Sequence, residues 1–258
     1  MKLLTSAAIL LVFVSLAMAE RKVMTWKVDG TTRRAIVYSP SKTSGKVPLV
    51  FSFHGHGDTA LNFEGVGLQD AWPEAVVVYP QGLASSRDGA PGWQGETGGD
   101  GDRDLKFVDQ AIAELHKTFP IDDGRIYATG FSNGARFTYL LWAVRPKVFA
   151  AFGPVAGMLA PSLTLNEPKP VVHVGGQQDR TNAFALQVQS IELAKRVNGV
   201  AGKGESCGHD CMLYTGKGAP VMTMIHPGGH IYPEGTSELI VRFFKQQRLD
   251  LEAANARK

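Results

Sequence analysis

A short stretch near the middle of the chain constrains the fold more than any other part of the sequence. Residues 126–128 (Ile-Tyr-Ala) form an apolar, β-favouring run, and the pattern Gly-x-Ser-x-Gly follows at residues 130–134. After it, Phe137, Leu140 and Leu141 recur at helical spacing. The pattern therefore joins a strand to a helix, which is the context that gives it chemical meaning.

The reason for the two glycines is steric. A serine at the apex of a sharp turn between strand and helix has a strained backbone, and its neighbours two positions away must be small because other backbone crowds them. Ser132 would then project from the carboxyl edge of a sheet, with the free N–H groups of a helix N-terminus behind it. Because the chain has 29 glycines, an ordinary glycine-rich turn is the alternative, and only a matching base, acid and oxyanion donor decide against it.

The first nineteen residues predict a segment that is not part of the fold. Lys2 gives a basic start, residues 3–16 are almost wholly apolar, and residues 17–19 (Ala-Met-Ala) form a small-x-small cleavage site. This pattern is typical of a secretory signal peptide. The alternative is an uncleaved anchor, but the apolar run is short for a spanning helix. We therefore predict a signal peptide at 1–19 and a secreted or periplasmic protein with no membrane association after cleavage.

Charge and length narrow the class of the remaining chain. The formal net charge is +3, and no dense Lys/Arg patch with interleaved aromatic residues occurs, so nucleic acid is not an expected partner. The sequence has no internal repeat, low-complexity segment or linker. Residues 20–258 are long enough for one sizeable core, and we predict a single domain.

Apolar runs and helical patterns alternate along this domain. The expected strands are 23–28, 34–38, 48–53, 75–79, 126–128, 148–155, 170–174 and 221–225, and the expected helices are 60–69, 105–119, 184–197 and 237–244, besides the helix after Ser132. Buried strands that alternate with helices indicate a mostly parallel sheet with helices on both faces. The connection between residues 155 and 170 is short, so no large lid domain is expected. Residues 85–102 form a long loop that contains Trp93, and such loops often line sites.

A serine hydroxyl needs a histidine to take its proton and an acid to orient that histidine. In sheets of this kind the order along the chain is Ser, then Asp or Glu, then His, each just past a strand. Asp179 follows the strand at 170–174, and His230 follows the strand at 221–225. Ser132, Asp179 and His230 are therefore the predicted nucleophile, acid and base.

Other residues could take these roles. Asp179 could instead cap the helix that follows it. His226 is the main rival to His230 because it lies closer to the strand end, but the Gly-Gly pair before His230 lets that loop approach another backbone. The remaining candidates are less well placed: His173 lies inside an apolar strand, and His209, Asp210 and Glu234 lie in loops or near a helix start.

An oxyanion hole needs two backbone N–H groups. One should belong to Asn133, directly after the nucleophile, and the other to His56 in the loop after the strand at 48–53, with Gly55 beside it as a substrate-binding position. The alternative for this glycine-rich loop is a plain tight turn.

The chain has two cysteines, Cys207 and Cys211, with three residues between them. In an exported protein an even count indicates a disulfide, here closing a small loop. The alternative is a metal site that also uses His209 and Asp210, but no second ligand cluster at zinc spacing is present.

Several motifs now occur together: His-Gly-His-Gly-Asp at 54–58, Tyr-Pro-Gln-Gly at 79–82, Trp93 ahead of an acidic helix start, the motif at 130–134, and Gly-His-Ile-Tyr-Pro at 229–233. This combination, over roughly residues 28–244, resembles the secreted polyhydroxybutyrate depolymerase-like esterases. These are similar to the feruloyl and acetylxylan esterases of carbohydrate esterase family one.

The resemblance implies an α/β-hydrolase fold and serine-dependent hydrolysis of a carboxylic ester, without metal or organic cofactor. By position, Ser132, His230 and Asp179 would be nucleophile, base and acid, and Trp93 would shape the acyl or polymer-facing cleft. The expected substrates are feruloyl or acetyl esters on plant cell-wall polysaccharide. The first alternative is a hydroxyalkanoate oligomer, since no separate polymer-binding module is seen, followed by a secreted peptidase and, in another class, a non-catalytic binding protein. The sequence does not determine the oligomeric state.

Overall fold

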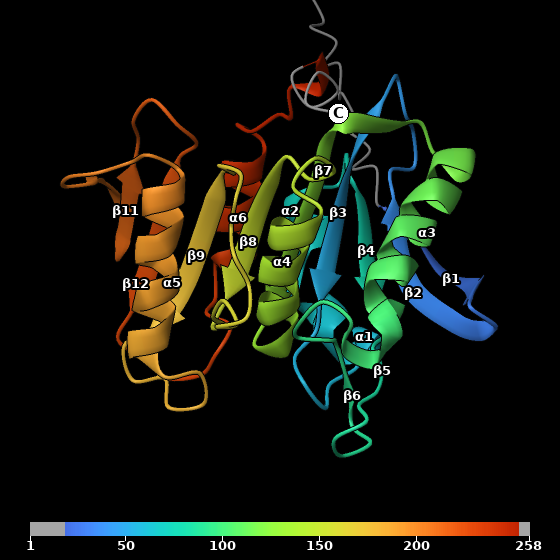
Figure 1. Ribbon diagram of the computed structural model, residues 1–258. Helices are drawn as coiled ribbons and strands as arrows, with labels where there is room; N and C mark the ends of the chain where they lie inside the picture. Colours follow the sequence, from blue (N-terminus) through green and yellow to red (C-terminus); the bar gives the residue numbers. More distant parts are fainter. Residues whose placement is uncertain (1–18, 253–258) are drawn as a thin grey trace, which may run out of the picture.

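The protein is built around one twisted sheet of ten strands (Figure 1). The structure, a computed structural model, describes residues 19–252. The predicted signal peptide therefore lies outside the described residues, except for Ala19. The strands lie in the order β1 (Glu20–Val28), β2 (Thr31–Ser39), β4 (Val76–Pro80), β3 (Val47–Phe53), β7 (Ile121–Phe131), β8 (Ala151–Val155), β9 (Val171–Gly176), β12 (Val221–His226), β11 (Cys211–Tyr214) and β10 (Glu205–Gly208). Two short strands, β5 (Leu83–Ala84) and β6 (Pro91–Gly92), pair separately.

The strands from β4 through β3, β7, β8 and β9 to β12 pair in parallel. The strands outside them pair antiparallel at both ends of the sheet. The prediction of a mostly parallel sheet is therefore confirmed. Because the carboxyl ends of the parallel strands meet at one edge, the loops that follow β3, β7, β9 and β12 lie close together there.

Helices cover both faces of the sheet, as predicted (Figure 1). The helices α3 (Arg103–Thr118), α4 (Asn133–Val144) and α5 (Phe184–Val197) lie on one face, and α1 (Ala60–Phe63), α2 (Leu68–Ala71) and α6 (Thr236–Phe244) lie on the other. Short 3-10 turns, η1 (Glu64–Val66) and η2 (Gly99–Asp102), precede α2 and α3. No helix among residues 19–252 has both the length and the hydrophobicity that a membrane crossing requires.

The prediction of one helix over residues 60–69 is wrong. α1 ends at Phe63 and passes into the 3-10 turn η1; the chain then turns at Gly67, whose φ of 76° is left-handed, and α2 begins anew. The first two expected strands are present and form a hairpin, in which Asp29 and Gly30, with φ of 47° and 79°, make the two-residue turn between β1 and β2.

The core has two layers because side chains alternate along each central strand. Every residue of β3 is buried, as predicted for a strand covered on both faces. Leu49, Phe51 and Phe53 belong to the cluster under α3 and α4, whereas Val50 belongs to the cluster under α1, α2 and α6. The sheet is thereby fixed between two apolar layers, and the loops at its carboxyl edge stand on a rigid base.

The hairpin of β10 and β11 was not predicted, since the sequence there indicates only a loop around the cysteines. Its turn depends on left-handed backbone at Asp210, with φ of 55°. Cys207 and Cys211 form a disulfide across it, which confirms that prediction. With both sulfurs bonded, the thiolates of the alternative metal site are removed, and residues 19–252 contain no group of three side chains able to hold a metal ion.

Candidate active site

Ser132 lies at the junction of β7 and α4 with φ of 56° and ψ of −113°, a strained conformation for a residue with a Cβ. The two glycines of the motif allow this turn. A Cβ on Gly130 would stand 2.6 Å from the backbone of Gly134, and a Cβ on Gly134 would collide with the Phe53 carbonyl. The strand–turn–helix context expected for Gly-x-Ser-x-Gly is therefore present.

The structure brings Ser132, His230 and Asp179 together from three separate loops. The Nε2 atom of His230 lies 2.8 Å from Ser132 Oγ, and its Nδ1 atom lies 2.8 Å from Asp179 Oδ2. With Nδ1–H donating to the carboxylate, Nε2 is left to accept the serine proton. This is the arrangement that activates a serine for nucleophilic attack.

The Asp179 carboxylate is fully buried and fully hydrogen-bonded. Its Oδ1 accepts the backbone N–H groups of Thr181 and Asn182, each at 2.9 Å. Its Oδ2 accepts Gln187 Nε2–H at 2.9 Å in addition to His230. Four donors therefore hold the carboxylate in one orientation, which in turn orients the imidazole.

A further set of buried side chains, the β9 network (Tyr139, His173 and Gln187), leads to this carboxylate. Gln187 Oε1 lies 3.2 Å from His173 Nε2, and Tyr139 Oη lies 2.8 Å from His173 Nδ1. Burial lowers the pKa of His173 to about 4, so the ring is neutral near pH 7. Its Nε2–H then donates to Gln187 while Nδ1 accepts from Tyr139. The sequence indicated a core position for His173 but gave no signal for Tyr139 or Gln187.

The rival histidines take no part in this arrangement. His226 is buried, its Nδ1 accepts the Gly228 N–H at 3.1 Å, and no hydrogen bond joins it to Ser132. Burial also lowers its pKa. His209 Nδ1 lies 3.0 Å from Asp210 Oδ2 in the turn after β10. Among residues 19–252, His230 is the histidine that lies within hydrogen-bond distance of Ser132.

The two residues predicted to supply the oxyanion donors, Asn133 and His56, line the same cleft as Ser132. Asn133 is the first residue of α4, where a backbone N–H has no acceptor within the helix. No hydrogen bond joins the His56 N–H to another residue within 19–252. Gly55 packs closely here, since a Cβ on it would lie 3.2 Å from the Phe131 ring and 3.6 Å from Ser132 Cβ.

Trp93 lines the site and links two of its loops through hydrogen bonds. Its indole is 5% exposed, and its Nε1–H donates to the His54 carbonyl at 2.9 Å. Its backbone N–H donates to Asn133 Oδ1 at 2.7 Å, and its carbonyl accepts Asn133 Nδ2–H at 3.0 Å. Trp93 therefore fixes the two loops that carry the predicted oxyanion donors. Burial lowers the pKa of His54, whose Nε2 accepts the Gly82 N–H at 2.9 Å.

A second set of buried polar side chains is the α3 network (Arg33, Gln94 and Asp104). Gln94 directly follows Trp93 in the chain. Arg33 forms an ion pair with Asp104 at 2.7 Å, and both side chains are almost wholly buried. The Gln94 backbone N–H donates to Asp104 Oδ2 at 2.9 Å, and the Gln94 side chain accepts the Asp104 N–H at 3.1 Å. The network fixes the start of α3 against the loop that carries Trp93.

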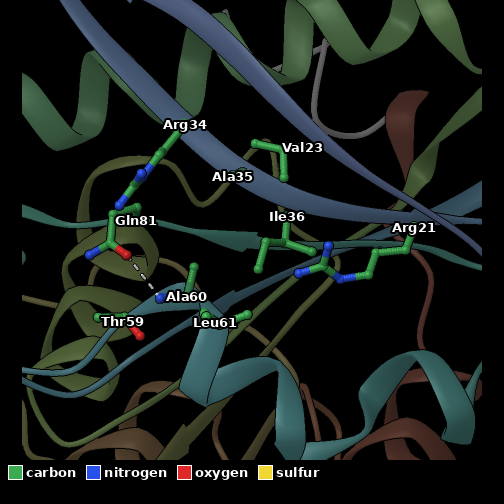
Figure 2. A pocket seen from close by; sticks show the side chains of 9 residues that line it. All are labelled: Arg21, Val23, Arg34, Ala35, Ile36, Thr59, Ala60, Leu61 and Gln81. Atoms are coloured by element: carbon green, nitrogen blue, oxygen red, sulfur yellow. Dashed lines mark hydrogen bonds between the residues drawn. The ribbon is translucent and has the colours of Figure 1, made fainter.

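The site opens into a cleft of about 840 Å³. Its lining includes Ser132, Asn133 and His56, together with much of the loop at residues 85–102, as that loop's length predicted. A smaller cavity of about 280 Å³ lies between β1, β2 and the start of α1 (Figure 2). Figure 2 shows Arg21 reaching over it, and Glu64 holds this arginine at 2.9 Å. No nucleophile with a neighbouring base lines this cavity, so the cleft at Ser132 is the candidate active site.

Comparison with known proteins finds ester hydrolases among the proteins to which this chain is similar. No protein family model matches it. It is 31% identical over 177 residues to the bifunctional acetylxylan esterase/xylanase XynS20E of Neocallimastix patriciarum, covering 64% of this chain and 23% of that protein. It is 27% identical over 197 residues to poly(3-hydroxyalkanoate) depolymerase C of Paucimonas lemoignei, covering 62% and 47%. It is 26% identical over 200 residues to a probable feruloyl esterase C of Aspergillus niger, covering 70% and 69%.

The chain therefore spans about a quarter and about half of the first two relatives. Among solved structures, an acetyl xylan esterase from Aspergillus awamori superposes with a TM-score of 0.66 at 16% identity, over 87% of this chain and 99% of the other. The fold is the α/β-hydrolase fold, and no large lid domain is present among residues 19–252. The resemblance stated from the sequence is confirmed, since acetylxylan, feruloyl and polyhydroxyalkanoate esterases all occur among the relatives.

Proposed function

We propose that the protein is a secreted serine esterase in which Ser132 attacks the carbonyl carbon of a carboxylic ester. The observation that carries this proposal is the continuous hydrogen-bond chain from Ser132 through His230 to Asp179, with both distances at 2.8 Å. A serine hydroxyl is a weak nucleophile until such a base accepts its proton. Secretion rests on the signal-peptide pattern of residues 1–19.

The mechanism follows from the atoms that face one another. His230 Nε2 takes the hydroxyl proton as Ser132 Oγ bonds to the ester carbon, and Asp179 stabilises the imidazolium. His230 then gives the proton to the leaving alcohol. A water molecule, deprotonated by the same nitrogen, attacks the acyl-enzyme, and the carboxylic acid and free Ser132 are restored.

The negative charge that develops on the carbonyl oxygen needs donors that are already in place. The backbone N–H groups of Asn133 and His56 are the donors we assign, with Trp93 holding their two loops together. One such donor contributes about 10²–10³-fold to kcat in well-studied serine hydrolases. The reaction uses no metal and no organic cofactor.

The substrates we propose are feruloyl or acetyl esters on plant cell-wall polysaccharide. The acetylxylan and feruloyl esterase relatives support this class, and a cleft of about 840 Å³ admits part of a sugar chain. The second candidate is a soluble hydroxyalkanoate oligomer, which the Paucimonas lemoignei relative favours.

The first experiment incubates residues 20–258 with p-nitrophenyl acetate, methyl ferulate, acetylated xylan and a hydroxybutyrate oligomer, each beside the Ser132→Ala variant. We expect hydrolysis by the wild type and a loss of at least about 10³-fold in the variant. The preferred substrate then separates polysaccharide esters from the polyester oligomer.

A serine-reactive phosphonate probe gives an independent reading. We expect stoichiometric labelling of Ser132 in the wild type and none in Ser132→Ala. If no ester is hydrolysed and Ser132 is not labelled, the protein is a non-catalytic binding protein on a hydrolase scaffold. A peptidase would instead be revealed by Ser132-dependent cleavage of peptide amides.

A further inference from the structure

Arg136 lies on the first turns of α4, four residues after Ser132. Arg136 is part of the lining of the cavity that contains Ser132 and Asn133. The mechanism described above makes no use of this guanidinium.

The Arg136 side chain has no hydrogen-bond or ion-pair partner among residues 19–252. Its Nε is buried without any acceptor. The other two arginines that line the cleft are paired: Arg87 lies 3.0 Å from Asp88, and Arg103 lies 3.5 Å from Asp100. Arg136 is therefore the cleft arginine whose charge no described acid neutralises.

Gly95 lies next to this guanidinium in the lining of the cleft, since a Cβ on Gly95 would stand 4.0 Å from Arg136 Nη2. Two acids also line the cleft, but Asp100 is engaged by Arg103, and Glu96 is exposed and forms no ion pair with Arg136. A planar guanidinium with free donors matches a carboxylate, which it can bind through two parallel hydrogen bonds.

The Nη groups of Arg136 have no acceptor among residues 19–252 and, unlike Nε, are not buried, so they are the donors open to a ligand in the cleft. We propose that Arg136 is a specificity-determining residue that binds a carboxylate on the substrate, so that the preferred esters carry a free carboxylate near the scissile bond. This inference rests on the proposed esterase function. It deepens that function by naming an anionic class of ester among the substrates.

Two sources supply such a carboxylate. One is an ester on a polysaccharide that also carries uronic acid residues, and the other is the free acid end of a hydroxyalkanoate oligomer. The chemistry at Arg136 is the same in both cases. Acetylated xylan with and without uronic acid, and a hydroxybutyrate dimer as free acid and as methyl ester, form the two arms that distinguish them.

The test compares matched anionic and neutral esters on the wild type, Arg136→Gln and Arg136→Lys. Mono-p-nitrophenyl succinate and its methyl ester provide the simplest pair. Loss of a charge-assisted hydrogen-bond pair should lower the anionic-to-neutral ratio of kcat/KM by roughly 10- to 100-fold in Arg136→Gln. Arg136→Lys keeps the positive charge but loses the planar pair of N–H donors. Its anionic-to-neutral ratio of kcat/KM should therefore lie between that of the wild type and that of Arg136→Gln.

Arg87→Gln is the matched control, since it removes a cleft arginine that already has Asp88 as its partner. Its ratio should stay within about twofold of the wild type. Equal losses on both esters in Arg136→Gln, or a wild type that does not prefer the anionic ester in either arm, would overturn the inference. Ser132-dependent hydrolysis of the neutral ester would then still support the proposed esterase function, so the two failures are distinguishable.

Discussion

The β9 network and the α3 network are both sets of buried polar side chains, and they end on different atoms. The β9 network ends on Asp179 Oδ2, the oxygen that also accepts from His230. The α3 network ends on backbone groups of the loop and helix that it joins. A buried polar network by itself therefore does not identify a functional site, because the atoms on which it ends decide its role. Damage to the first should appear in activity, and damage to the second in stability.

The strongest test of this contrast is Asp179→Asn, which replaces the carboxylate on which the β9 network ends. An amide cannot hold the His230 tautomer that leaves Nε2 free to accept a proton, so we expect kcat to fall by about 10³–10⁴-fold. Steady-state kinetics measure the loss, and circular dichroism controls for folding. Activity near that of the wild type would place the acid elsewhere.

Arg33→Met removes the only positive charge of the three side chains in the α3 network. It leaves the buried Asp104 carboxylate without its charge partner, and the free energy of unfolding should fall by about 3–5 kcal/mol. At a temperature where the variant is folded, kcat should stay within about threefold of the wild type. Urea unfolding measures the first effect. Adding Asp104→Asn removes the unpaired charge while keeping an acceptor for Gln94, so the double variant should regain part of the loss. A large fall in kcat with intact folding would contradict the structural role.

The pH dependence of the free energy of unfolding tests the β9 network through His173. Burial lowers the pKa of His173 from its ordinary value of 6.5 to about 4. The unfolded chain therefore binds a proton below pH 6.5 while the folded protein does not, so stability is lost as the pH falls from 6.5 towards 4. The loss amounts to about 3 kcal/mol. Urea unfolding of the wild type and His173→Gln at pH 7, 5 and 4 should show their difference narrowing by that amount; a constant difference would show that His173 titrates normally.

A matched pair of glutamine variants compares the two networks directly. Gln187→Leu removes a donor to the Asp179 carboxylate, and kcat should fall by roughly 10- to 100-fold, with phosphonate labelling of Ser132 slowed in parallel. Gln94→Leu removes a glutamine of the α3 network and should lower the unfolding free energy with little change in kcat. Equal effects of both variants on kcat would abolish the distinction between the networks.

The smallest effect is expected at the far end of the sheet. Cys207→Ser with Cys211→Ser opens a short loop in the hairpin of β10 and β11, and loop entropy predicts a loss of about 2 kcal/mol. No residue of this hairpin lines the cleft, so kcat should be unchanged. Thermal unfolding with and without reductant measures the loss, and a large fall in activity would link the hairpin to the site.

Several features of the site could be predicted because they depend on short stretches of sequence. The steric need for glycine on both sides of Ser132 is local, and so is the position of Asp179 and His230 just past apolar strands. The order of parallel strands then brings these loops to one edge of the sheet. The split of the helix at Gly67 was missed because its apolar spacing continues across a left-handed turn.

The sequence by itself determined the alternation of strands and helices, the strained turn at Ser132 and the order of the three proposed reacting residues. Only the tertiary structure decided which side chains become partners. Tyr139, His173 and Gln187 come from α4, β9 and α5, and their contacts exist because the sheet order packs these elements together. That Arg136 has no side-chain partner within residues 19–252 is likewise a property of the space around it, since periodicity encodes which face a residue occupies but not what lies opposite that face.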